Sequence, residues 1–441
     1  MALFWTQNNL SRRRTVVFAS ALTAASILLA ITAVGSLPAF DESSPNASAR
    51  TGEPPFDPLG GLPPYAVVPY GNEFALTPPM GWNGYNHFGL DVTAQTVRDM
   101  ARELVLTGMK SLGYVYVNLD GGWDLRERSR TGELQPDPKK FPQGIKPVVD
   151  YVHSLGLKFG IYTSAGKRNC ANTSAGSFGH YQQDADTFAA WGVDYVKLDW
   201  CFMPVREYSF MSHVGLSQML AKRFGAALAA TGRRMVLDIN DWIDTSTSDW
   251  ANSLGNVGRI AIDIGDTYPS MVSNFIHDVA HYRTAGPDHW NDPDMLEVGN
   301  PGMTFNEQRT QFTLWAELAA PLIAGNDLSD MTVEARAILT NASVIGVDQD
   351  RLGAQGYPVT NRKGHWVLSK PLLDGNRAVV LFNQTDKPAL IRTTVADIGL
   401  SGAKTYQLQD LWTGEVHETD NLISAFVPPH CAEMYIVAPV A

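Results

Sequence analysis

Cysteine is scarce in this sequence, and positive charge is outweighed by negative charge. Three cysteines and ten histidines occur among 441 residues, and they are too scattered to match the spacing of zinc ligands. Lys and Arg number 34 against 45 Asp and Glu, which gives a formal net charge of −11. Phosphate contacts need an excess of basic residues. The composition therefore predicts no metal site and argues against a nucleic-acid partner.

Charged residues are missing from one long run near the N-terminus. Arg12, Arg13 and Arg14 precede this run, and no residue from Val16 to Val34 is charged. A basic flank before an apolar run is typical of an export signal or a membrane anchor. The run is long for the core of a signal peptide and about long enough to span a bilayer, which favours the anchor. We therefore predict a signal peptide or membrane tether over residues 1–36, and an extracellular or cell-surface location.

The phosphate-binding loop of nucleotide-binding folds is also missing. Residues 37–76 read as a linker rich in Pro, Gly and Ser, and strands and helices alternate after it. Such alternation predicts a parallel sheet, and at least six repeats in roughly 270 residues fit a barrel better than an open sheet. A doubly wound sheet would need a glycine-rich loop after its first strand. We predict a (β/α)8 TIM barrel over residues 77–352, with strands that include 114–120, 157–163, 193–199, 234–240 and 258–264.

Helical periodicity disappears from the last part of the chain. From about Gly353, short apolar runs follow one another closely, separated by turn residues such as Asp374-Gly375-Asn376. Closely spaced strands without helices are typical of an antiparallel sandwich. We therefore predict a C-terminal antiparallel β-sandwich domain over residues 353–441.

The predicted strand that ends in "YVKLD" carries charge on one face. Side chains alternate along a strand, so Lys197 and Asp199 point one way while Val196 and Leu198 point the other. If the apolar pair faces the helices, Lys197 and Asp199 face the barrel axis, at the end where barrel enzymes place their chemistry. Other strand ends carry Asp120, Asp238, Asp241, Asp263, Asp266, Asp292 and Asp294. One such Asp is typical of a turn or helix cap, but five strand ends together predict an acidic barrel mouth, which suits glycoside hydrolysis.

The few cysteines still allow one disulfide. In an exported protein Cys170 and Cys201 can pair, which would leave Cys431 free. This bridge would close a loop of about 30 residues and stabilise the fold by roughly 3 to 4 kcal/mol in the chain-entropy model.

Several segments between about Thr77 and Gly353 resemble glycoside hydrolase family 27, the α-galactosidase family. They include "TPPMGWNGYNHF", "GYVYVNLDGGW", "DADTFAAWGVDYVKLDWC" and "WNDPDMLEVGN". The resemblance implies a (β/α)8 barrel followed by an antiparallel β-domain. It also implies retaining hydrolysis of terminal α-D-galactosyl residues by double displacement, with a carbohydrate substrate and no cofactor.

The same resemblance implies roles for single residues. The nucleophile would be Asp199 and the acid/base Asp263. The acid/base must start protonated, and a poorly solvated site would favour that. The resemblance also supports the pairing of Cys170 with Cys201. Substrate-binding roles fall on Trp82, Tyr85, Asp120, Tyr162, Lys197, Asp241 and Arg259.

Three positions depart from the family pattern. Gly121 stands where the family has a second acidic residue, Tyr85 where it has Trp, and Asp241 where it has Glu. These positions are predicted to touch the sugar, so they keep another family substrate open, namely a β-L-arabinopyranoside or an α-1,6-glucan such as isomalto-dextran. A non-catalytic sugar-binding barrel is a further alternative. The presence of both Asp199 and Asp263 argues against it.

Overall fold

The computed structural model describes residues 72–241 and 247–440. The predicted signal or anchor, and nearly all of the predicted linker, therefore lie outside the described residues. Of the helices in these two ranges, none has both the length and the apolar content needed to cross a bilayer.

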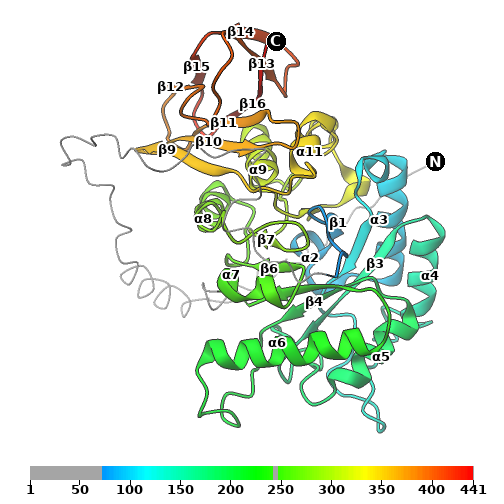
Figure 1. Cartoon of the computed structure of the whole chain (residues 1–441). Helices are drawn as coiled ribbons and strands as arrows, with labels where there is room; N and C mark the ends of the chain where they lie inside the picture. Colours follow the sequence, from blue (N-terminus) through cyan, green and yellow to red (C-terminus); the bar gives the residue numbers. More distant parts are fainter. Residues whose placement is uncertain (1–71, 242–246, 441) are drawn as a thin grey trace, which may run out of the picture. The chain divides into compact units, whose positions relative to one another are not determined.

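Eight parallel strands form the barrel (Figure 1). Each strand from β1 to β6 pairs with the next one in the chain, and β1 also pairs with β8. A parallel bridge between Leu296 and Ala324 joins the segment after β7 to β8. This sequential order confirms the predicted barrel and excludes a doubly wound sheet, in which the order reverses. The strands are β1 (Met80–Asn83), β2 (Tyr116–Leu119), β3 (Lys158–Ser164), β4 (Tyr195–Asp199), β5 (Val236–Asn240), β6 (Val257–Arg259), β7 (Trp290–Asp292) and β8 (Leu322–Ala324).

Amphipathic helices cover the outside of the strands (Figure 1). In α3, a capping box formed by Thr93 and Thr96 starts the helix, and Val97 and Leu104, which lie at helical spacing on one face, are buried. The helices are α2 (Tyr85–Phe88), α3 (Ala94–Leu106), α4 (Lys146–Ser154), α5 (Tyr181–Trp191), α6 (His213–Ala230), α7 (Thr247–Trp250), α8 (Tyr268–Val279), α9 (Phe305–Leu318), α10 (Val333–Leu339) and α11 (Ala342–Asp348).

Strand β6 ends at Arg259 and is therefore shorter than the strand predicted over residues 258–264. The backbone N–H of Ile260 still donates to the carbonyl of Asp292 on β7, at 3.2 Å. Farther along, the N–H of Ile264 donates to Oδ2 of Asp294 at 2.8 Å. The buried carboxylate of Asp294 thus binds the backbone in place of a neighbouring strand. As a result, Asp263 lies on a loop beyond the strand rather than at its end.

The C-terminal domain is antiparallel, as predicted (Figure 1). Its six-stranded sheet has the order β14-β13-β16-β11-β10-β9, and β12 pairs with β15. Buried Val379, Leu381, Ile391 and Ile423 belong to its core. The strands are β9 (Tyr357–Arg362), β10 (His365–Pro371), β11 (Arg377–Asn383), β12 (Ala389–Thr394), β13 (Tyr406–Asp410), β14 (Val416–Thr419), β15 (Leu422–Val427) and β16 (Ala432–Pro439).

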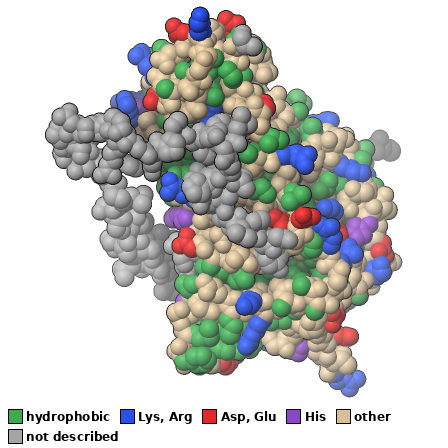
Figure 2. Space-filling view, viewed as in Figure 1, with side chains coloured by type: hydrophobic (Ala, Val, Ile, Leu, Met, Phe, Trp, Pro, Cys, Tyr) green, Lys and Arg blue, Asp and Glu red, His purple; other side chains and the backbone are tan. Residues whose placement is uncertain are grey.

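Charges of both signs are interspersed on the surface shown in Figure 2. On this face, the described Lys and Arg side chains stand singly or in small groups, with Asp and Glu among them. Proteins that bind nucleic acid usually concentrate their basic residues in a patch or stripe. On the face shown in Figure 2, the described basic side chains are instead spread among acidic ones.

Candidate active site

A cavity opens at the carboxyl ends of the barrel strands, and most of the predicted site residues line it. Those predicted residues are Tyr85, Asp120, Tyr162, Lys197, Asp199, Arg259 and Asp263. They come from β3, β4, β6 and the segments that follow β1, β2 and β6. The parallel barrel brings these strand ends to one rim, which is why residues far apart in the sequence share one cavity.

Lys197 and Asp120 form a buried ion pair on one side of this cavity. Lys197 Nζ donates to Asp120 Oδ2 at 2.9 Å, and Asn83 Nδ2 donates to the same oxygen at 2.8 Å. Burial raises the pKa of Asp120, but the charge of Lys197 and the hydrogen bonds outweigh burial and hold that pKa below its usual value. Burial lowers the pKa of Lys197, but the charges of Asp120, Asp294 and Asp199 together more than reverse this effect. Both groups are therefore charged at neutral pH.

Asp199 is almost completely buried at the end of β4, with 5% of its surface exposed. The Tyr162 hydroxyl donates to Asp199 Oδ2 at 2.6 Å, and the backbone N–H of Trp200 donates to Oδ1 at 2.8 Å. Burial raises the pKa of Asp199 to about 6, although the charge of Lys197 and the hydrogen bond from Tyr162 both lower it. Lys197 thus favours the ionised carboxylate, but burial has the larger effect on its pKa.

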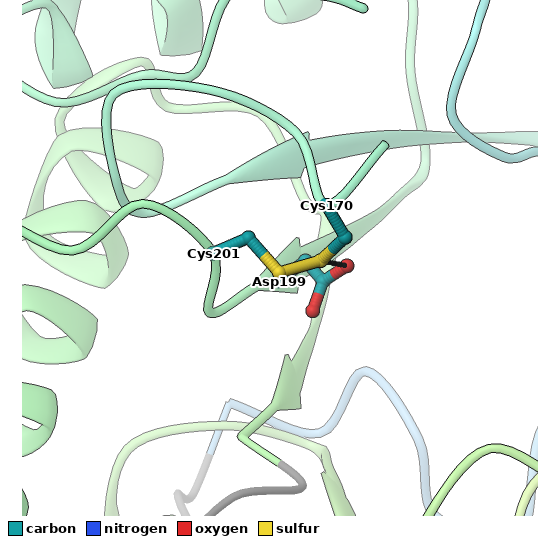
Figure 3. Close-up of side chains that lie close together, drawn as sticks. All are labelled: Cys170, Asp199 and Cys201. Carbon is teal, nitrogen blue, oxygen red and sulfur yellow. Dashed lines mark hydrogen bonds between the residues drawn. A yellow bond between two sulfur atoms is a disulfide. The ribbon is translucent and has the colours of Figure 1, made fainter. Parts of the chain in front are cut away.

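A disulfide lies directly beside this carboxylate (Figure 3). It joins Cys170 to Cys201 with their Cα atoms 5.0 Å apart, and it leaves Cys431 as a buried free thiol, which confirms the predicted pairing. Cys170 Sγ lies 2.9 Å from Asp199 Oδ2. These two cysteines and Asp199 are close enough to surround an ion, but sulfurs bonded to each other offer no thiolate to a metal. The bridge instead fixes the loop after β3 against the end of β4.

Arg259 connects Asp263 to the floor of the cavity. Its guanidinium is buried and donates to Asp263 Oδ1 at 2.8 Å and to Asp294 Oδ2. The Asp263 side chain is 71% exposed, in contrast to the poorly solvated site that we expected. The difference follows from the early end of β6, which places Asp263 on the rim loop. Asp199 and Asp263 therefore sit in opposite environments, one buried and one open to water.

Comparisons with known proteins agree with this geometry. Residues 77–350 match the family model described as alpha galactosidase A, and residues 362–437 match its C-terminal beta sandwich domain. The chain is 41% identical over 375 residues to alpha-galactosidase of Cyamopsis tetragonoloba, which covers 83% of this chain and 88% of that protein. It is 40% identical over 369 residues to alpha-galactosidase of Oryza sativa subsp. japonica, covering 83% and 86%. The crystal structure of alpha-galactosidase I from Mortierella vinacea superposes with a TM-score of 0.78 at 33% identity, covering 83% and 99%.

The chain belongs to the α-galactosidase family, glycoside hydrolase family 27.

Two residues that were predicted to contact the sugar, Trp82 and Asp241, do not line this cavity. Trp82 is fully buried, and its Nε1 donates to the carbonyl of Asn326 at 2.8 Å. Its neighbour Asn83 faces inward to Asp120, so the alternation along β1 turns Trp82 toward the helices. Asp241 is also fully buried, directly before residues 242–246, which are not described.

The cavity also contains residues that the sequence reasoning missed. Asn240 ends β5 as Asp199 ends β4. Its position at a strand end is the same signal that indicated the acids, but its side chain is an amide. Asn86 lies in a short helix and Asn169 in a loop. The alternation that shows which way the side chains of a strand point does not apply to them. The missed lining residues are Asn86, Leu90, Asn169, Ala171, Asn240, Ile264 and Met295, and the cavity also contains Gly121, Cys170 and Asp294, which were named from the sequence.

Proposed function

We propose that this protein is a retaining glycoside hydrolase that removes terminal α-D-galactosyl residues from a carbohydrate substrate. One observation carries the proposal. A buried carboxylate, Asp199, and an exposed one, Asp263, line the same cavity beside the charged pair Lys197–Asp120. A retaining glycosidase needs two carboxyl groups at one site, one as the nucleophile and one as the acid and base. The ammonium and carboxylate of the pair supply a donor and an acceptor for sugar hydroxyls.

In the first step, Asp199 acts as the nucleophile. Above its pKa of about 6 the carboxylate is ionised, and one of its oxygens attacks the anomeric carbon of the galactosyl unit. Asp263 donates its proton to the glycosidic oxygen as the bond to the leaving group breaks. The products of this step are the free leaving-group alcohol and a galactosyl ester of Asp199.

In the second step, Asp263 acts as a base. Its carboxylate takes a proton from water, and the water oxygen attacks the anomeric carbon of the ester. The ester bond breaks, Asp199 recovers its negative charge, and the sugar leaves with its original anomeric configuration. Arg259, held between Asp263 and Asp294, keeps the rim carboxylate near the anomeric centre in both steps.

Gly121 favours a second candidate, another glycoside hydrolysed by the same mechanism. A Cβ atom at this position would meet the ring of Tyr162 at 3.5 Å and Asn169 Nδ2 at 3.7 Å, which are ordinary contact distances. The space beside Asp120 is therefore open where the family has a second acid. A β-L-arabinopyranoside or an α-1,6-glucan remains the alternative substrate.

A panel of aryl glycosides tests both candidates. Soluble protein from residue 72 onward is assayed with aryl α-galactoside, β-L-arabinopyranoside and α-glucoside, and the anomer released first is identified by NMR. We expect the highest kcat/KM with the α-galactoside and the α anomer as the first product. Preference for another glycoside would select the second candidate, and release of the β anomer from the α-galactoside would refute the retaining mechanism. Absence of turnover with every glycoside would leave a sugar-binding protein.

We further propose that the N-terminal segment exports the protein to the cell surface or the medium. Three arginines followed by an uncharged apolar run support this proposal. Expression of the full chain, followed by separation of membrane, medium and cytoplasm, tests it. The enzyme should be found in the membrane fraction if the segment is kept, and in the medium if it is cleaved. Recovery in the cytoplasm would contradict export.

A further inference from the structure

We propose that Asn86 is a further sugar-binding residue of this cavity and that the buried Glu297 acts as its positioning residue by fixing the orientation of its amide. The inference builds on the proposed function, because it concerns how the same cavity holds its sugar. Neither residue was singled out by the sequence.

The contacts of Glu297 support this assignment. Glu297 follows β7 and is 1% exposed. Its Oε1 accepts a hydrogen bond from Asn86 Nδ2 at 2.5 Å, and its Oε2 accepts one from Asn300 Nδ2 at 2.6 Å. The backbone N–H of Glu297 donates to Gln311 Oε1 on α9, at 2.8 Å. Both carboxylate oxygens thus accept hydrogen bonds from side-chain amides, and the side chain of Gln311 fixes the backbone of Glu297.

An ionised carboxylate accepts hydrogen bonds and cannot donate them. While Glu297 is ionised, Asn86 must therefore turn its NH2 group toward it. The amide oxygen of Asn86 is then left as an acceptor, and no donor within residues 72–241 and 247–440 occupies it. Asn86 lines the cavity together with Asp294 and Met295, so this oxygen can accept a hydrogen bond from a sugar hydroxyl.

The surroundings of Glu297 make this orientation depend on pH. Burial raises the pKa of Glu297 to about 7, and although its two amide partners lower it, the charges of Asp266 and Asp294 raise it further. The imidazole of His87 lies near the same group, with its Nδ1 3.1 Å from Asn300 Oδ1.

A protonated Glu297 has an O–H that can donate to an amide oxygen. The amide of Asn86 is then free to turn over and present NH2 to the cavity instead of its oxygen. The acceptor for the sugar hydroxyl is therefore kept above about pH 7 and lost below it. This change acts on substrate binding and leaves the two catalytic carboxylates untouched.

A double-mutant cycle tests the inference with an aryl α-galactoside. Asn86→Ala removes the acceptor, and Glu297→Gln keeps the size but supplies a donor at every pH. Losing one hydrogen bond to a neutral hydroxyl corresponds to about a 2- to 10-fold rise in KM. We expect this rise in both single variants at pH 8, with kcat nearly unchanged. Because Glu297 acts through Asn86, the double variant should be no worse than Asn86→Ala.

The control is Glu317→Gln, which neutralises another fully buried glutamate that does not line the cavity. Its KM should equal that of the wild type, and thermal unfolding of each variant reports its folding. KM should rise below pH 7 in the wild type, and it should lose that dependence in Glu297→Gln. Additive effects of the two substitutions, or a fall in kcat at unchanged KM, would overturn the inference. Wild-type turnover itself reports on the proposed function, so the two failures are distinguishable.

Discussion

Replacing Tyr162 by Phe should change the pH dependence of the enzyme without disturbing its fold. The Tyr162 hydroxyl donates to Asp199 Oδ2 at 2.6 Å, and its ring is buried beside β4. The substitution removes one hydrogen bond to the ionised carboxylate and keeps the ring. Because this bond stabilises only the ionised form, its loss must raise the pKa of Asp199 above its value of about 6.

The size of the shift follows from the strength of the hydrogen bond. A hydrogen bond to a charged group contributes about 1.5 to 3 kcal/mol, and one pKa unit corresponds to about 1.4 kcal/mol. The pKa of Asp199 should therefore rise by about one to two units. Since the nucleophile must be ionised, kcat/KM at pH 5 should fall about 10- to 100-fold relative to the wild type, with a smaller loss at pH 8.

The assay is kcat/KM for an aryl α-galactoside measured from pH 4 to pH 9. The acidic limb of this profile reports ionisation of the free enzyme, and it should move toward higher pH in Tyr162→Phe. Tyr195→Phe is a matched control, because the Tyr195 hydroxyl donates to Asp238 Oδ2 at 2.9 Å and neither residue lines the cavity. An acidic limb that stays in place in Tyr162→Phe would refute the assignment of that limb to Asp199.

Three further predictions concern mechanism, specificity and stability. Asp199→Asn should lose nearly all turnover on every substrate. Asp263→Asn should lose about 10²- to 10⁴-fold in turnover of substrates with poor leaving groups and less with good ones, and added azide should restore part of its turnover. If the two variants behaved alike, their assigned roles would be contradicted. Gly121→Asp, whose Cβ would lie at ordinary contact distances, should change the ratio of kcat/KM between α-galactoside and the other aryl glycosides. An unchanged ratio would mean that position 121 does not contact the sugar. Burial raises the pKa of both Glu317 and Asp348 to about 8, so the native state binds more protons than the unfolded state and the Tm should fall as the pH rises from 5 to 8. Calorimetry checks this slope, which Asp348→Asn should flatten; an equally steep slope in that variant would count against the assignment.

The sequence alone was sufficient wherever the structure repeats with a fixed period. The alternation in β4 placed Lys197 and Asp199 on one face, and the structure shows Lys197 paired with Asp120 while Val196 and Leu198 are fully buried in the core. The alternation of strands and helices predicted the barrel, and the barrel predicted that acids at the strand ends would meet. These features are local, because each depends only on neighbouring residues and on the geometry of a strand.

Only the tertiary structure decided what happens between the regular elements. Trp82 lies in a strand, yet which of its two faces points inward depends on the barrel that forms around it. The early end of β6 and the exposure of Asp263 result from Asp294, a residue on another loop, which binds the backbone of Ile264. Asn86 lines the cavity and donates a hydrogen bond to the buried Glu297, which is more than two hundred residues away in the chain. Loop positions of this kind are set by contacts distant in sequence, and no local pattern records them.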